Sequence, residues 1–178
     1  MNEEFIKKMV RREAQTAVGA STARNIGAKG AVKAARAYLE RLDPNDFIQD
    51  NLDAFTKKLD DHTEKLKESL PQEAQSRGFS RKFLNIFLRN ILYNYYLRPH
   101  FKFEKIERFL EVPLDGHTAN GLIFDDNKEN NLPKWKTIKN LDLSTHSQFQ
   151  EVASKIAKMK NIERVHLDLI YWRKKEDE

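Results

Sequence analysis

Residues 77–98 of the chain read RGFSRKFLNIFLRNILYNYYLR, and this stretch decides the fold. Apolar side chains recur in it at three- and four-residue spacing, which is the period of an α-helix. Ser80 is a residue type that caps helix N-termini, and the pair Arg98-Pro99 ends the pattern because proline cannot continue a helix. The segment is apolar almost all round. We therefore expect a central apolar helix that its neighbours bury on several sides.

The remainder of the chain also favours helices over strands. Lys, Arg, Glu, Ala and Leu are abundant, whereas six Gly and five Pro are too few for a turn-rich β-barrel. Further helices are expected at residues 5–18, 31–42, 51–70, 103–110, 116–124 and 144–160. The expected fold class is all-α, as a compact helical domain that spans residues 1–178.

Several local details follow from the same patterns. Ser144 is the expected N-cap of its helix, with Met159 facing inward, and the glycines between residues 19 and 30 predict a turn. Residues 164–172 fit either a strand or a last helix by pattern alone. The charged residues 173–178 are expected to be a frayed tail.

Composition excludes several functional classes. The chain has 178 residues and no cysteine, which excludes disulfides, thiolate zinc sites, cysteine-ligated iron–sulfur clusters and cysteine nucleophiles. No window approaches the roughly 20 apolar residues that a membrane span needs. The N-terminus MNEEFIKKMVRREA is charged where a signal peptide would be apolar. We therefore expect a cytoplasmic protein with no membrane partner.

The charge is distributed in blocks along the chain. Residues 1–41 hold nine basic and four acidic groups, residues 42–76 four and nine, residues 77–110 eight and two, and residues 111–178 eleven and twelve. The most basic block is also the most aromatic, so a partner that carries phosphates is plausible there. An ordinary solvated helix face explains a net charge of +5 equally well.

Most common catalytic and cofactor motifs are absent. There is no GxxxxGK[ST] loop, no GxGxxG fingerprint and no GxSxG elbow in the sequence. The five histidines lack the close spacing of metal ligands. We expect neither a metal nor a cofactor.

Three local arrangements remain as candidate chemistry. Lys82 falls in the first turn of the apolar helix, where burial and neighbouring cations would lower its pKa and make its amine a better nucleophile. Asp115, in VPLDGH, stands at the expected start of a helix. Asp168 and Trp172, in HLDLIYW, would share one helix face. Each also has an ordinary explanation: an exposed lysine, a helix cap and a satisfied core pair.

These three pieces, in this order, resemble the helix-hairpin-helix DNA glycosylases, and among them the archaeal-type 8-oxoguanine DNA glycosylase/AP lyases. The resemblance covers residues 77–172, and residues 1–76 are unmatched. It rests on Lys82 in RKFLNIFLRN, Asp115 in VPLDGH and the closing HLDLIYW. Where the superfamily has an L-P-G-x-G hairpin before the lysine, this chain has Ser-Arg-Gly-Phe at 76–79.

The resemblance implies a bifunctional enzyme of base excision repair. Lys82 would attack the sugar carbon of a flipped nucleotide, such as 8-oxoguanine in double-stranded DNA, and form a Schiff base; Asp115 would assist. It implies a base pocket formed by Asp168, Trp172, Ile86 and His166. It implies DNA contacts by Arg77, Arg81, Arg89 and Lys102, although Arg89 could instead pair with an acid in the core. In a prokaryote such an enzyme would be associated with the nucleoid.

Two other functions compete with this one. The chain could be a non-catalytic nucleic-acid-binding or host-defence module that keeps the fold without the chemistry, and it would then bind nucleic acid in a salt-dependent way without cleaving it. It could also be a helical interaction protein whose aromatic helix forms a partner surface. The distance between Lys82 and Asp115 separates the first function from the other two. The sequence does not reveal the oligomeric state.

Overall fold

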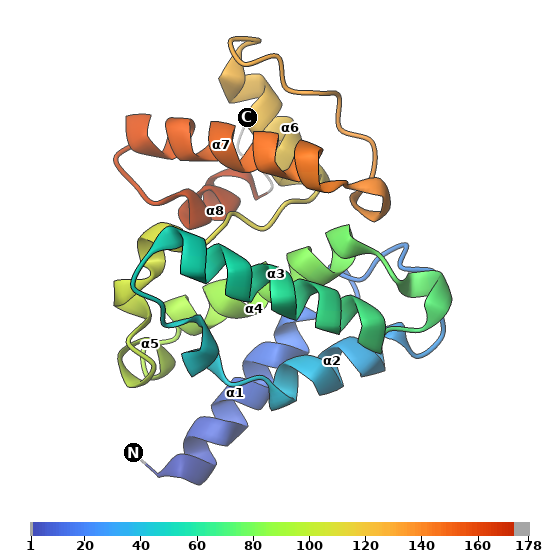
Figure 1. Cartoon of the computed structure of the whole chain (residues 1–178), viewed down its shortest axis with the longest axis vertical. Coiled ribbons are helices and arrows are strands. Elements are labelled where there is room, and N and C mark those ends of the chain that lie inside the picture. The colour runs from blue at the N-terminus through green and yellow to red at the C-terminus, as the bar shows by residue number, and fades with distance from the viewer. Residues whose placement is uncertain (1, 173–178) are drawn as a thin grey trace.

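The computed structural model describes residues 2–172, and within that range it is helical with no β-strand, which confirms the all-α class (Figure 1). Its α-helices are α1 Glu3–Ala17, α2 Ala31–Arg41, α3 Leu52–Ser69, α4 Arg77–Tyr93, α5 Leu97–His100, α6 Gly116–Asp126, α7 Leu143–Met159 and α8 Leu167–Tyr171. Short 3₁₀ turns lie at Pro44–Phe47, Gln72–Ala74, Phe103–Lys105, Glu107–Phe109, Ile138–Asn140 and Arg164–His166. The predicted tail at 173–178 lies outside the described residues.

Helix α4 begins and ends earlier than the sequence pattern predicts. Its N-cap is Ser76, whose hydroxyl accepts a hydrogen bond from the backbone N–H of Phe79, and the predicted cap Ser80 is buried inside the helix. The helix ends at Tyr93, and its C-cap is Asn94, whose side-chain Oδ1 accepts hydrogen bonds from the backbone N–H groups of Tyr96 and Leu97. An asparagine that binds the following backbone in this way competes with helix continuation. The apolar periodicity therefore runs past the actual C-terminus of the helix.

Helix α4 packs against α1, α2, α3 and α5. Eleven consecutive residues of it, from Gly78 to Leu88, are buried. Gly78 allows the turn at Ile138–Asn140 to come close, because a Cβ at this position would lie 1.9 Å from the carbonyl oxygen of Ile138. The start of α4 is thus fixed directly against backbone from the second half of the chain.

Two hydrophobic clusters divide the described chain. The first contains side chains from α1 to α5, and the second contains side chains from α6, α7 and α8. Figure 1 shows the same grouping, with α6, α7 and α8 on one side of the molecule and α1 to α5 on the other. The chain passes from the first cluster to the second between Leu110 and Val112. The two clusters are in contact, since Ile138 packs against both.

Helix α8 settles the alternative left open for residues 164–172, which form a 3₁₀ turn followed by a helix. Tyr171 is buried against α6, where a Cβ on Gly121 would lie 2.2 Å from its ring. Its hydroxyl donates a hydrogen bond to Asp125 at 2.8 Å. The absence of a side chain at Gly121 therefore lets α8 dock onto α6.

Other local predictions are corrected or confirmed. The expected helix at 103–110 is a pair of 3₁₀ turns, and the N-cap of α7 is Asp142 rather than Ser144. Met159 is exposed, not inward-facing. The predicted turn before α2 is confirmed, since Gly27 and Gly30 adopt φ values of 82° and 87°, which glycine tolerates without strain.

Across residues 2–172, no helix combines the length and apolar character that crossing a bilayer demands.

Candidate active site

Lys82 and Asp115 meet between the two hydrophobic clusters. Lys82 lies on α4 and is 8% exposed, and its Nζ is 3.5 Å from Oδ2 of Asp115. The earlier start of α4 places Lys82 in the second turn rather than the first. The two side chains therefore contact one another, although they are 33 residues apart in the chain.

Asp115 is also the N-cap of α6. Its Oδ1 accepts hydrogen bonds from the backbone N–H groups of His117 and Thr118, at 3.0 and 3.1 Å. The helix N-terminus carries partial positive charge and favours a carboxylate there. The capping interactions fix the orientation of the side chain, which leaves Oδ2 directed at Lys82. The cap and the catalytic hypothesis are therefore compatible at this residue.

Burial lowers the pKa of the Lys82 amine below its ordinary value, and the nearby Asp115 carboxylate opposes this effect without cancelling it. Desolvation penalises the charged form of a lysine, whereas an adjacent anion favours it. The predicted direction of the shift is therefore found, although burial rather than neighbouring cations produces it. A larger fraction of Lys82 is neutral, and so nucleophilic, than of an exposed lysine at the same pH.

The segment that leads to Asp115 is held at four consecutive residues, 109–112, which we call the 109–112 strap. Arg164 donates to the carbonyl oxygens of Phe109 and Leu110 at 2.9 and 3.0 Å. Gln150 on α7 accepts from the backbone N–H of Val112 and donates to its carbonyl oxygen, at 3.1 and 2.8 Å. Hydrogen bonds to its backbone thus tie the strap to α7 and to the 3₁₀ turn Arg164–His166.

Glu111 is the side chain that ties the strap to α4. Its carboxylate accepts two hydrogen bonds from Arg81, at 2.8 and 3.0 Å, and one from Asn85 at 2.9 Å. His146 of α7 has its Nε2 3.2 Å from the same carboxylate. Burial acts to raise the pKa of Glu111, but His146 and Arg81 together hold it well below its ordinary value. Glu111 is therefore a buried anion that α4 and α7 share.

Arg81 completes this cluster on the side of α3. Its Nη1 donates to Asp60 and Thr63, both at 2.9 Å, and the residue is 2% exposed. A guanidinium so enclosed does not reach a phosphate on the surface. Arg81, predicted to contact DNA, is therefore occupied in this structure by Glu111, Asp60 and Thr63.

Arg89 and Asp168 form an ion pair two helical turns beyond Lys82, on the same face of α4. Asp168 on α8 pairs with Nη1 of Arg89, and its Oδ1 accepts a weaker hydrogen bond from Thr118 at 3.4 Å. The alternative that Arg89 pairs with an acid is therefore the one found. Asp168, predicted to contact a flipped base, has its carboxylate engaged by these two partners.

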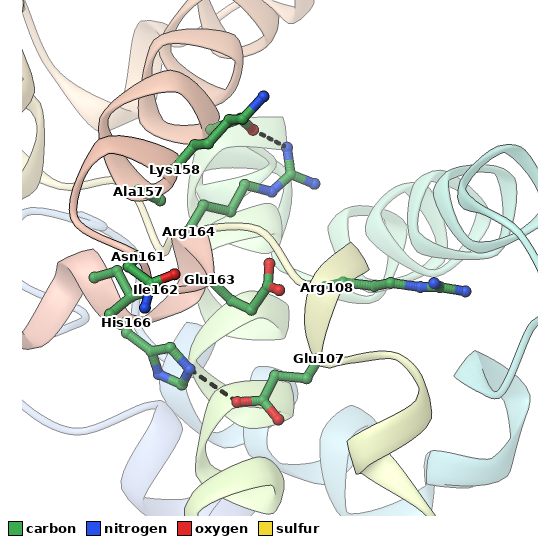
Figure 2. Close-up of a pocket in the computed structure, with 10 residues that line it drawn as sticks. Glu107, Arg108, Ala157, Lys158, Asn161, Ile162, Glu163, Arg164 and His166 are labelled. Atoms are coloured by element: carbon green, nitrogen blue, oxygen red, sulfur yellow. Dashed lines mark hydrogen bonds and ion pairs between the residues drawn. The ribbon is translucent and has the colours of Figure 1, made fainter.

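His166 joins the end of α4 to the turn that precedes the strap. Its Nδ1 lies 2.8 Å from the hydroxyl of Tyr93, and its ring stacks on the Tyr93 ring with an interplanar angle of 10°. Its Nε2 lies 2.9 Å from Glu107. Figure 2 shows His166 and Glu107 pointing toward one another across a groove of about 660 Å³, which Arg164 also lines. His166 is therefore engaged on both ring nitrogens.

The other predicted site residues lie in different settings. Ile86 is on the same face of α4 as Lys82 and is 5% exposed, while Trp172 is the C-cap of α8 and is 65% exposed. Arg77 pairs with Asp60 and Glu64 on α3. Lys102 is exposed at the start of a 3₁₀ turn.

Surface grooves of about 660, 520, 470 and 450 Å³ mark the described part of the chain, and neither Lys82 nor Asp115 lines any of these four. The Lys82 side chain is largely buried, whereas the Asp115 side chain keeps 32% of its surface exposed. The pair is therefore open to solvent on the side of Asp115, while the Lys82 amine is largely covered.

Sequence reasoning missed Glu111, Gln150 and Arg164. One signal was available for Glu111, since it interrupts the apolar run Leu-Glu-Val-Pro-Leu at 110–114, and a charge in such a run is buried and paired if the run is buried. Gln150 and Arg164 carry no comparable local signal. The backbone partner of Gln150 is 38 residues away in the chain, and those of Arg164 are 54 and 55 residues away.

Among residues 2–172, no cluster of three or more His, Asp or Glu side chains could hold a metal ion. A comparison of the chain with protein-family models, curated proteins and solved structures finds no match.

Proposed function

We propose that this protein is a DNA glycosylase/AP lyase of base excision repair that removes an oxidised purine, such as 8-oxoguanine, through a Schiff base on Lys82. One observation carries the proposal. A lysine that is largely buried, with a lowered pKa, lies 3.5 Å from the carboxylate of Asp115, which stands 33 positions further along the chain. A desolvated amine beside a fixed carboxylate is an arrangement suited to covalent catalysis at a sugar carbon.

The chemistry assigns a separate task to each residue. The damaged nucleotide leaves the base stack, since its glycosidic carbon C1′ is out of reach within the duplex. The neutral Lys82 amine forms a bond to C1′ while the bond to the base breaks, and the departing base takes the electron pair and a proton. Asp115 accepts the proton released by the amine and stabilises the positive charge that develops on the sugar.

The lyase step follows from the same covalent intermediate. The proton that Asp115 has accepted passes to the sugar ring oxygen as that oxygen leaves C1′ with its electron pair. The ring opens, and an iminium ion forms between C1′ and Lys82. Loss of a proton from C2′ then expels the 3′ phosphate by β-elimination and cuts the strand. Lys82 is freed when water hydrolyses the iminium ion.

The Lys82 amine is largely buried, so the proposal includes a movement that uncovers it when DNA binds. The Arg89–Asp168 ion pair joins α4 to α8, on the same α4 face as Lys82. Separation of this pair would free the Asp168 carboxylate for the edge of the base and Arg89 for a phosphate. Lys102, which is exposed, remains a candidate phosphate contact.

A non-catalytic nucleic-acid-binding module is the second candidate function. The engagement of Asp168 by Arg89 and Thr118 favours it, because a satisfied ion pair needs no ligand. In such a module the Lys82–Asp115 contact is only an ion pair that joins α4 to the start of α6. Salt-dependent binding without cleavage is the expected behaviour.

The test is an assay of base release and strand cleavage on a duplex with a single 8-oxoguanine. The wild-type protein should perform both steps, Lys82→Gln neither, and the control Lys105→Gln, at an exposed lysine, should match the wild type. Circular dichroism and thermal melting establish that the variants are folded, and Lys82→Met provides a second neutral replacement. Activity in folded Lys82→Gln would refute the proposal. Binding without cleavage by the wild type would favour the second candidate.

A further inference from the structure

Two adjoining surface grooves run between α1 and the C-terminal end of α4. One, of about 450 Å³, is lined by Phe5, Lys8, Tyr95 and Tyr96 among others, and the second, of about 470 Å³, by Arg89 and Tyr93. Arg12 and Asn94 line both. We call the two together the α1–α4 groove.

Aromatic side chains are exposed along this groove. Tyr95 is 83% exposed, Tyr96 47% and Phe5 49%, and they form a chain of edge contacts in which ring centroids are 5.2 Å apart for Tyr95–Tyr96 and 6.5 Å for Phe5–Tyr96. Exposed apolar residues that occur singly need no explanation, but a contiguous group of them marks an interaction site. Tyr95 therefore has most of its surface available to a flat ligand, and Tyr96 and Phe5 have about half of theirs.

Positive charge accompanies these aromatic rings. Lys8 and Arg12 lie on the same face of α1 as Phe5, at helical spacing. Arg89 lines the groove from α4, with its guanidinium paired to Asp168. Lys8 forms an exposed i,i+4 pair with Glu4 at 2.8 Å, an interaction that contributes little and is easily exchanged. The acid lining the groove is Glu13, which accepts hydrogen bonds from Asn94 and Thr16. The groove as a whole therefore suits an anionic partner.

The groove and the candidate active site lie along the same face of α4. Lys82, Ile86, Arg89 and Tyr93 are spaced at i, i+4, i+7 and i+11, so they share one face of α4. At 1.5 Å per residue, Tyr93 is about 17 Å from Lys82 along the helix axis. Arg89 belongs to both places, since it lines the groove and pairs with Asp168 near the Lys82–Asp115 contact.

We propose that the α1–α4 groove binds a single-stranded stretch of DNA next to the nucleotide that reaches Lys82. Bases stack on Tyr95, Tyr96 and Phe5, and phosphates contact Lys8 and Arg12. Basic grooves that carry aromatic side chains bind single strands in this way, because only an unpaired base offers its face for stacking. The proposal gives a role to α1, which the glycosylase resemblance does not cover. It rests on the proposed function only for the position of the strand next to Lys82.

The experiment measures binding by fluorescence anisotropy, without cleavage, to labelled single-stranded DNA, to duplex DNA and to single-stranded RNA of the same sequence. The double variant Tyr95→Ala/Tyr96→Ala should bind the DNA single strand roughly tenfold more weakly or worse, with a much smaller effect on duplex. Arg12→Gln should weaken binding and reduce the slope of log affinity against log salt by about 1.

Two control variants replace exposed residues that lie outside the α1–α4 groove. Met159→Ala on α7 controls for the loss of an exposed apolar side chain, and Lys57→Gln on α3 for the loss of a positive charge. Both should bind like the wild type. If the tyrosine variant melts at a lower temperature, Arg12→Gln still decides, because Arg12 is exposed and its loss removes only charge.

Three results would overturn the inference. They are unchanged single-strand affinity in both folded groove variants, an equal loss on duplex and single strand, and tighter binding of RNA than of DNA. Failure of this inference is distinct from failure of the proposed function. If the groove variants bind normally while the wild type cleaves 8-oxoguanine duplex, only the groove proposal falls. If the wild type does not cleave but the groove variants lose affinity, only the glycosylase proposal falls.

Discussion

The two carboxylate oxygens of Asp115 have different partners. Oδ1 caps α6 through two backbone N–H groups, while Oδ2 lies next to the Lys82 amine. A substitution can therefore remove the charge and keep the cap, because asparagine is as good an N-cap as aspartate. This separation makes Asp115→Asn a more informative variant than an alanine replacement.

We expect Asp115→Asn to slow base release by roughly 10² to 10³-fold, the size of effect that follows loss of a charged group that stabilises a transition state. The pH profile should also move. Asp115 raises the pKa of Lys82, so its neutralisation lowers that pKa further, and the amine becomes neutral at lower pH. The rate of the variant should therefore reach its plateau at a lower pH than that of the wild type.

Single-turnover rates measured across a pH series test both parts of this prediction, and thermal melting confirms that the α6 cap survives. A plateau rate equal to that of the wild type would mean that Asp115 serves only as a cap. A pH profile that does not move would mean that Asp115 does not act on the Lys82 amine.

At the scale of the elements, the 109–112 strap explains why Lys82 and Asp115 meet. The strap enters the second hydrophobic cluster, and five side chains from other elements hold it: Arg81, Asn85, His146, Gln150 and Arg164. Glu111 has partners on both α4 and α7. Because Asp115 follows the strap by three residues, we infer that the strap fixes its distance from α4.

Glu111→Gln tests this role through stability. Removal of one partner from a buried ion pair leaves the other charge uncompensated, and we expect a loss of about 3 kcal/mol in the free energy of unfolding near neutral pH. Exposed Glu73→Gln, the matched control, should change it by less than about 0.5 kcal/mol. Denaturant unfolding of the two variants and the wild type measures the difference.

The pH dependence of that difference has a defined sign. The pKa of Glu111 is lower in the folded protein than in the unfolded chain, where glutamate has a pKa of about 4.3. Its stabilisation is therefore complete above about pH 4.3 and is lost as the pH falls from there through the folded pKa. A difference between the wild type and Glu111→Gln that stays constant down to acid pH would contradict the assigned role.

Element positions were largely predictable from the sequence, while some of their ends were not. Apolar periodicity located α2, α3, α4 and α7, because it reports which face of a helix is buried. It overran the end of α4 because the Asn94 side chain binds the backbone that follows, an effect that no periodicity contains. It also suggested one helix at 103–110, where two 3₁₀ turns lie.

At the scale of the whole molecule, the candidate site lies where two helical clusters meet. Lys82 belongs to an element of the first cluster, and Asp115 to an element of the second. Sequence motifs singled out both residues as candidates. The strap that leads to Asp115 could not be predicted, because its partners are distant in the chain and several of its hydrogen bonds are to backbone atoms. Likewise, Asp168 and Trp172 could be named from the motif, but their surroundings could not, because the Arg89 partner comes from a helix nearly 80 residues earlier.

The central claim is that Lys82 is the nucleophile, and locating the covalent bond tests it most directly. The protein is incubated with sodium borohydride and a duplex that contains one 8-oxoguanine, and the reduced adduct is digested and mapped by mass spectrometry. Our account predicts a sugar remnant on Lys82 and on no other amine. An adduct on a different lysine, or no adduct with either this duplex or an abasic one, would contradict it.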